Sequence, residues 1–107
     1  MNVYKPDRWV VVEFTTPTKT YTKVFAGWYG GFAQGDSWKL NSGITAIRIY
    51  KDLFEFDGYS GSMYQCNRHN YGMSSYMLGI WTGWKKQSDS QEGVSLRILE
   101  LDEVVVS

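Results

Sequence analysis

Short segments rich in β-branched and aromatic residues, separated by turn-forming residues, constrain the fold of this chain more than any other feature. Residues 8–14 read RWVVVEF and begin just after Pro6, and the turn sequence TTPTK at residues 15–19 separates them from a second such segment at residues 20–28. Residues of these types favour extended strands, and two strands joined by a short turn form a β-hairpin. The first quarter of the chain therefore predicts a hairpin.

The strand pattern continues through the middle of the chain. Residues 36–40 predict a short strand before the turn sequence NSG, and residues 44–50 predict a longer one. Residues 53–56 and 62–66 lie on either side of the dipeptide Asp57-Gly58, which strongly favours a turn. Residues 44–66 therefore predict a meander of three strands. A final strand is predicted over residues 94–105.

The hydrophobic period changes after residue 72. Apolar side chains then recur at helical spacing and form a stripe that consists of Met73, Met77, Ile80 or Trp81, and Trp84. This stripe predicts a helix over about residues 73–86, with Ser74 or Ser75 as the residue that caps its start. Gly79 and Gly83 each weaken a helix by about 1 kcal/mol. We expect them to leave a flat face that lets the helix lie close to a sheet.

These elements predict one domain of the mainly β (α+β) class that spans residues 1–107. We expect a curved antiparallel sheet, or a small barrel of about six strands, with the one helix packed on it. The chain has five Trp, eight Tyr and five Phe residues, which is more ring volume than a core of this size can hide. Some rings are therefore expected at the surface, and Tyr and Trp are enriched at binding surfaces.

Charge and cysteine content restrict the partners and the cellular compartment that we expect for the protein. Eleven basic and eleven acidic side chains cancel, whereas a generic nucleic-acid coat needs a clear basic excess. No stretch approaches the roughly 20 apolar residues of a membrane span, and the start of the sequence lacks the apolar run of a secretion signal. The single cysteine, Cys66, cannot form an intrachain disulfide. We expect a soluble protein of a reducing cytoplasm with no membrane partner.

The sequence carries no recognisable catalytic apparatus, so we expect a binding protein and not an enzyme. His69 is the only candidate histidine base, and Cys66 lies three residues away, a spacing that puts two side chains on opposite faces of a strand. One histidine and one cysteine without clustered carboxylates predict no metal site, and we expect no cofactor. Asp36, Glu55 and Asp57 show no spacing that marks a glycosidase pair.

Two loops, at residues 27–32 and 58–62, combine glycines with aromatic rings. Glycines let backbone N–H groups turn towards an anion, and rings can stack on a base. The alternative is that both loops are tight β-turns, since neither matches a known phosphate-binding fingerprint. Together with nearby cationic side chains, these loops define the candidate ligand-binding residues: Trp28, Tyr29, Trp38, Lys39, Arg48, Tyr59, Ser60, Arg68 and His69.

Four segments carry a resemblance to known proteins: KPDRWVV at residues 5–11, AGWYGG at residues 26–31, GDSWKLNSGI at residues 35–44 and GSMYQC at residues 61–66. They resemble a family of small uncharacterised accessory proteins encoded by tailed bacteriophages, and the likeness spans most of residues 4–82. The resemblance implies a protein made in the cytoplasm of an infected bacterium. It brings no assigned activity, so it assigns no site residues.

Three hypotheses of function follow. The first is a non-enzymatic anti-defence protein that sequesters a nucleotide-like signalling molecule, as a homo-oligomer. The second is an inhibitor that binds a host protein, either a defence enzyme or a target of host takeover, through a face formed by Tyr76, Trp81 and Trp84. The third is a minor virion component. The expected partner is accordingly a nucleotide-like small molecule or a host protein.

Overall fold

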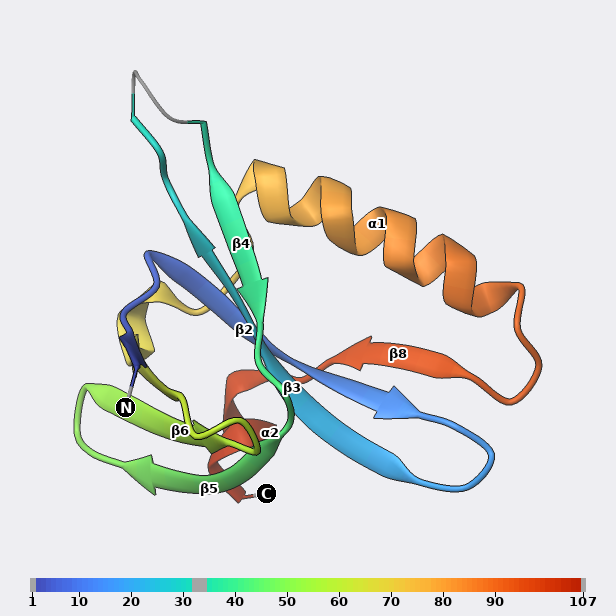
Figure 1. The fold of residues 1–107 in the computed structure, drawn as a ribbon, viewed down its shortest axis with the longest axis horizontal. Coiled ribbons are helices and arrows are strands. Elements are labelled where there is room, and N and C mark those ends of the chain that lie inside the picture. The colour runs from blue at the N-terminus through green and yellow to red at the C-terminus, as the bar shows by residue number, and fades with distance from the viewer. Residues whose placement is uncertain (1, 32–34, 107) are drawn as a thin grey trace.

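The strands of this protein form two separate sheets, which are seen in the computed structural model of residues 2–31 and 35–106 (Figure 1). The elements follow one another along the chain as β1 (Val3–Tyr4), β2 (Arg8–Thr15), β3 (Thr20–Trp28), β4 (Ser37–Leu40), β5 (Ile44–Ile49), β6 (Leu53–Gly58), β7 (Met63–Asn67), a 3₁₀ turn (Arg68–Asn70), α1 (Ser75–Asp89), β8 (Ser95–Ile98) and α2 (Leu101–Val106). The mainly β class with one long helix is confirmed.

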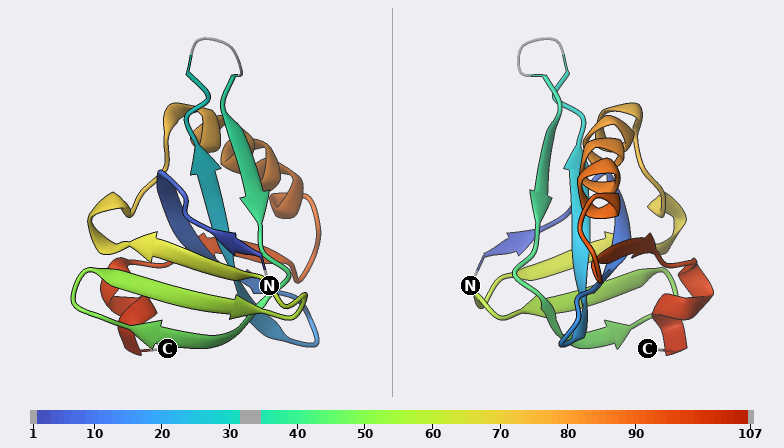
Figure 2. Two further views of the ribbon diagram at one scale, coloured as in Figure 1. Left: turned by 60° about the vertical axis from the view of Figure 1, so that its left-hand side comes forward. Right: turned by 90° about the vertical axis from the view of Figure 1, so that its right-hand side faces the viewer.

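Each sheet has four strands. Sheet I has the order β1-β7-β6-β5, in which β1 runs parallel to β7 and the other pairs are antiparallel. Sheet II has the order β4-β3-β2-β8 and is antiparallel throughout. The predicted hairpin and three-strand meander are both present. The two sheets cross one another (Figure 2) and do not close into a barrel within the described residues.

Sheet II is the middle layer of the molecule, between sheet I and α1 (Figure 2). Trp9 and Val11 of β2 belong to a core cluster that includes the inner face of sheet I, whereas Val10 and Val12 belong to a second cluster that contains Met77 of α1. This arrangement explains the unbroken apolar run of β2. A strand that is buried on both faces has no solvent side on which polar residues could alternate.

The helix α1 packs on sheet II through the predicted stripe. The Ser74 side chain caps its start by accepting a hydrogen bond from the Met77 N–H at 3.2 Å. The glycines Gly79 and Gly83, however, point into open space and not at the sheet. The close approach comes instead from Gly27 of β3, where a Cβ atom would lie 2.5 Å from the Met77 sulfur. The expected role of the helix glycines was therefore wrong.

The predicted final strand at residues 94–105 was also wrong in its second half. The strand β8 ends at Ile98, the Leu99 N–H donates to the Val11 carbonyl, and the chain then turns into α2. The Glu103 carboxylate accepts a hydrogen bond from the Glu100 N–H at 2.8 Å. Acidic side chains in the first turn also favour a helix start, because the N-terminal end of a helix carries partial positive charge.

Candidate ligand-binding site

Two carboxylates from outside the first glycine loop occupy the backbone amides to which an anion would bind. The Tyr29 N–H donates to Asp7 Oδ2 at 2.9 Å, and the Gly30 N–H donates to Asp36 Oδ1 at 3.2 Å. Gly27 belongs to β3 and not to the loop. Phe32 lies outside the described residues. Because two amides of the loop already face carboxylates, this loop is poorly suited to hold a phosphate.

The second glycine loop is a tight turn that satisfies its own backbone. The N–H groups of Gly58 and Gly61 donate to the carbonyls of Ser62 and Gly58, respectively. The Tyr59 N–H donates to the Gly43 carbonyl, and the Ser60 N–H donates to Ser42 Oγ at 2.9 Å. No amide between residues 58 and 61 remains for a bound anion. The residue Tyr59, by contrast, is 78% exposed.

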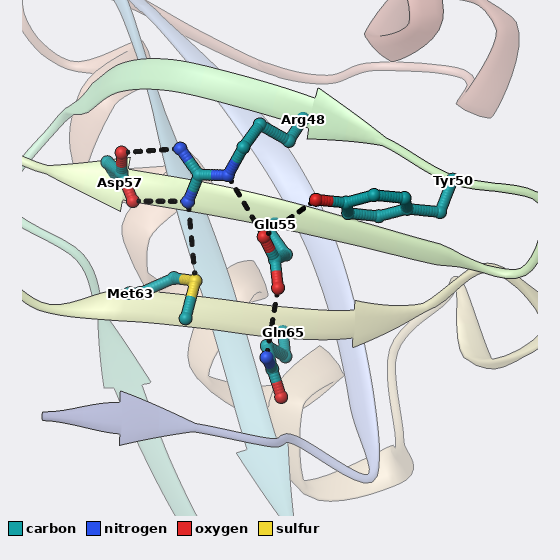
Figure 3. Close-up of polar contacts among 6 residues, drawn as sticks. All are labelled: Arg48, Tyr50, Glu55, Asp57, Met63 and Gln65. Carbon is teal, nitrogen blue, oxygen red and sulfur yellow. Dashed lines mark hydrogen bonds and ion pairs between the residues drawn. The ribbon is translucent and has the colours of Figure 1, made fainter.

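Arg48 lies on the outer face of sheet I, where acidic side chains surround its guanidinium (Figure 3). Its Nε donates to Glu55 at 2.9 Å, and its two terminal nitrogens donate to the two oxygens of Asp57, each at 2.8 Å. These hydrogen bonds raise the pKa of Arg48 and lower the pKa values of both carboxyl groups. The guanidinium is thus neutralised within the molecule and is not available as an anion site.

The rings and lysine predicted near β3 and β4 separate to two faces of sheet II. The Trp28 ring packs edge-on to Tyr4 at 6.3 Å, and Lys39 Nζ lies 5.2 Å from the centre of the Tyr4 ring. Trp38 lies on the opposite face, with its ring 5.2 Å from that of Trp84. The structure therefore brings Trp28 and Lys39 together at Tyr4 but places Trp38 with the helix.

Arg68 and His69 lie at the far end of sheet I, after β7. The guanidinium of Arg68 stacks 4.8 Å from the Phe54 ring centre, and His69 Nε2 lies 3.0 Å from Asp52 Oδ1 at the surface. Cys66 is buried in the core cluster below, and burial raises the pKa of its thiol. The side chains of Cys66 and His69 thus lie in different environments.

The described residues contain an apolar pocket of about 320 Å³ between the last turns of α1 and sheet II. We call it the Trp84 pocket. Its walls are Phe14, Leu40, Trp84, Val94 and Leu96, and its polar rim is formed by Gln87, Ser88 and Gln91. The Ser88 hydroxyl donates to a carbonyl of α1, whereas the two glutamine carboxamides have no hydrogen-bond partner among the described residues.

A cationic hollow of about 500 Å³ lies on the neighbouring part of β3, and we call it the lysine cleft. It is lined by Lys19, Thr20, Tyr21, Lys23, Ser42, Gly43 and Tyr59, with no carboxylate in the lining. The ammonium groups of Lys19 and Lys23 lie 4.9 and 5.8 Å from the centre of the Tyr21 ring. Neither ammonium has a carboxylate partner within the described part of the chain.

The Phe14 ring links the two hollows. It lines the Trp84 pocket, it stacks on Tyr21 with a 5.3 Å separation of ring centres, and Lys23 Nζ lies 5.7 Å from its own centre. An apolar ring site with free carboxamides therefore lies next to two unpaired positive charges. Such an arrangement can hold a planar apolar group at one end and an anionic group at the other.

Most of this candidate site was not predicted from the sequence. Of the nine predicted residues, Tyr59 alone lines either hollow. Lys19 and Lys23 had a signal, since two lysines frame the ring of Tyr21 at alternate strand positions on one face. Gln87 and Gln91 had no such sequence signal, because the pocket lies in a space left between a helix and a sheet whose residues are far apart in the sequence.

Metal-ligand clusters and membrane-spanning helices are two further features that can be looked for in the described residues. They contain no group of three or more His, Cys, Asp or Glu side chains placed to hold a metal ion. None of their helices is both long and apolar enough to span a bilayer. Comparisons of the chain with protein-family models, with curated proteins and with solved structures found no match.

Proposed function

We propose that this protein binds a nucleotide-like small molecule and performs no chemistry on it. The observation that carries the proposal is the adjacency of the Trp84 pocket and the lysine cleft through the ring of Phe14. A base would occupy the pocket and a phosphate would lie over Lys23 and Lys19. The ligand would therefore bind along the α1 side of sheet II and not in the glycine loops.

The chemistry of each part suits this ligand class. Trp84 and Phe14 line the pocket with aromatic rings, and stacking on such rings contributes about 1–3 kcal/mol per base. The carboxamides of Gln87 and Gln91 can each donate and accept hydrogen bonds at a base edge. A lysine ammonium supplies a charge-assisted contact to phosphate, which contributes about 1.5–3 kcal/mol.

The biological setting is part of the same proposal. The resemblance to phage accessory proteins suggests an anti-defence role in the host cytoplasm, in which the protein sequesters a nucleotide signal. A homo-oligomer would raise the number of molecules held by each particle. Exposed apolar side chains on α1, Tyr76 at 40% and Leu78 at 50% exposure, support a contact between copies.

The test is a binding assay with a defined panel of nucleotides. Intrinsic tryptophan fluorescence would be recorded while AMP, GMP, cyclic mononucleotides and cyclic dinucleotides are titrated, because the ring of Trp84 lines the pocket. We expect saturable quenching by at least one of them. Lys23→Ala should then weaken binding about 10- to 100-fold, which corresponds to the loss of one charge-assisted contact.

Matched variants separate the site from general charge effects. Gln87→Ala and Gln91→Ala should change the preference between bases while leaving phosphate-dependent affinity in place. Lys51→Ala removes an exposed lysine that lines neither hollow, and it should leave binding unchanged. Equal losses of nucleotide affinity in Lys51→Ala and Lys23→Ala would contradict the proposal. Absence of fluorescence quenching by every nucleotide in the panel would also contradict it.

A further inference from the structure

The first half of β3 is an open sheet edge. The strand β4 pairs only with residues 25–28 of β3. Beyond it, Asn41 satisfies both backbone groups of Val24: the Val24 N–H donates to Asn41 Oδ1, and the Val24 carbonyl accepts from the Asn41 N–H. Since backbone groups alternate in direction along a strand, Thr22 and Thr20 project theirs on the same side as Val24. Those groups have no partner in the described part of the chain.

Two hollows lie along this edge where sheets I and II meet. The lysine cleft lies on one side, and a second hollow of about 360 Å³ lies on the other, between Thr22 and residues 44–47 of β5. The part of the β2–β3 hairpin that carries this edge extends beyond the end of β4 (Figure 1). A strand added to β3 would therefore place its alternate side chains into the two hollows.

The positive charge at this edge favours an added strand that carries acidic side chains. The linings of both hollows contain no carboxylate, and Lys19 and Lys23 are positively charged and unpaired. Glu13, which is paired with Thr22 across the hairpin, is engaged by Arg97 at 3.5 Å. Pairing of this edge with the same edge of a second copy would bring lysines against lysines, and like charges on facing strands destabilise a sheet.

We propose that the free edge at residues 20–23 binds an extended acidic segment of a partner protein by strand addition. The partner's backbone pairs with Thr20 and Thr22. Its acidic side chains face Lys19 and Lys23 in the lysine cleft, and its alternate apolar side chains enter the hollow beside β5. This surface does not include the Trp84 pocket, but it shares Lys19 and Lys23 with the phosphate position proposed above. The edge can therefore bind a peptide whether or not the pocket accepts a base, and a peptide and a nucleotide would compete for the two lysines.

The test is an NMR titration of the whole protein with two synthetic octapeptides, one alternating glutamate and valine and one alternating lysine and valine. We expect the glutamate peptide to shift the amide signals of residues 20–23 and 42–47 in a saturable manner. The lysine peptide should bind at least 10-fold more weakly. Shifts confined to other regions, or equal binding of both peptides, would overturn the proposal.

Two variants test the backbone and the charge separately. Thr22→Pro removes an N–H that points away from β2, and proline is tolerated at such an edge. It should weaken the glutamate peptide at least 10-fold. Lys19→Glu combined with Lys23→Glu keeps the edge and should reverse the preference to the lysine peptide. If the double variant does not reverse the preference, the proposal is overturned, even if Thr22→Pro fails to fold. Self-association of the protein through residues 20–23 in sedimentation experiments would also overturn it.

Discussion

The Tyr71 hydroxyl joins two segments that are far apart in the sequence. It accepts a hydrogen bond from the Val11 N–H at 3.1 Å and donates one to the Leu99 carbonyl at 2.7 Å. Burial is the main cause that raises the pKa of Tyr71 to about 12. The phenol therefore stays protonated, and able to donate, across the physiological range of pH.

Tyr71→Phe should lower the free energy of unfolding by about 1–3 kcal/mol, because it leaves the Val11 N–H and the Leu99 carbonyl without their partner in the interior. Urea denaturation monitored by circular dichroism would measure the loss. The matched control is Tyr76→Phe, at a residue of α1 that is 40% exposed, and this variant should stay within about 0.5 kcal/mol of the parent. Equal effects of the two changes would contradict the assigned role of Tyr71.

The ion-pair network around Arg48 predicts a pH dependence of stability. The pKa values of Glu55 and Asp57 are lowered in the folded protein, chiefly by hydrogen bonds from Arg48. The unfolded chain therefore binds protons more readily, and stability should fall as pH decreases from about 5, through the ordinary carboxyl pKa values near 4, to the lowered ones. Above that window the full contribution is present.

Arg48→Gln should make this acid dependence shallower, because the carboxyl groups then titrate closer to their ordinary pKa values in both states. Urea midpoints at pH 7, 5, 4 and 3 would measure the slope. Lys51→Gln, which changes an exposed lysine in the turn between β5 and β6, should retain the parental slope. A parental slope in Arg48→Gln would mean that the network does not govern acid stability.

The two exposed glycines of α1 are positions at which a substitution should increase the stability of the protein. A Cβ atom at Gly79 or Gly83 would meet no atom within 4 Å. Replacing each with alanine should stabilise the protein by about 1 kcal/mol, since glycine loses more backbone entropy in a helix. Thermal unfolding should shift upwards by several degrees per substitution. Gly27→Ala should do the opposite, because its Cβ would collide with the Met77 sulfur.

Local patterns predicted those elements whose signals lie within one segment. The hairpin of β2 and β3 follows from its turn and its β-branched residues, and α1 follows from an apolar stripe with a capping serine. The end of β8 did not follow, because residues 99–106 remain rich in Val and Leu and contain no proline or glycine. The start of α2 depends on the Glu103 side chain, which accepts a hydrogen bond from the Glu100 N–H. The valines that follow favour a strand, so the sequence pattern did not indicate this helix. The strand β1 has two residues and pairs with a distant partner, so it left no local pattern.

The candidate site depends on how the layers meet, which explains why so little of it was predicted. Phe14 is an ordinary strand residue by its pattern, and Gln87 and Gln91 resemble any solvated end of a helix. Their proximity results from contacts between segments that are about 70 residues apart in the sequence. The glycine loops drew attention because their signal is local, yet their amides are already engaged by Asp7, Asp36 and neighbouring backbone groups.

The central position of β2 has a kinetic consequence. One of its neighbours, β3, follows after a short turn, but the other is β8, with Val12 opposite Ile98. Sheet I likewise joins β1 to β7 across about 60 residues. Loops this long are slow to close, so we expect folding in milliseconds to seconds rather than microseconds. During that interval one side of the most apolar strand has no β8 beside it, and a growing or truncated chain that lacks residues 95–98 would be the form most prone to aggregate or to need a chaperone.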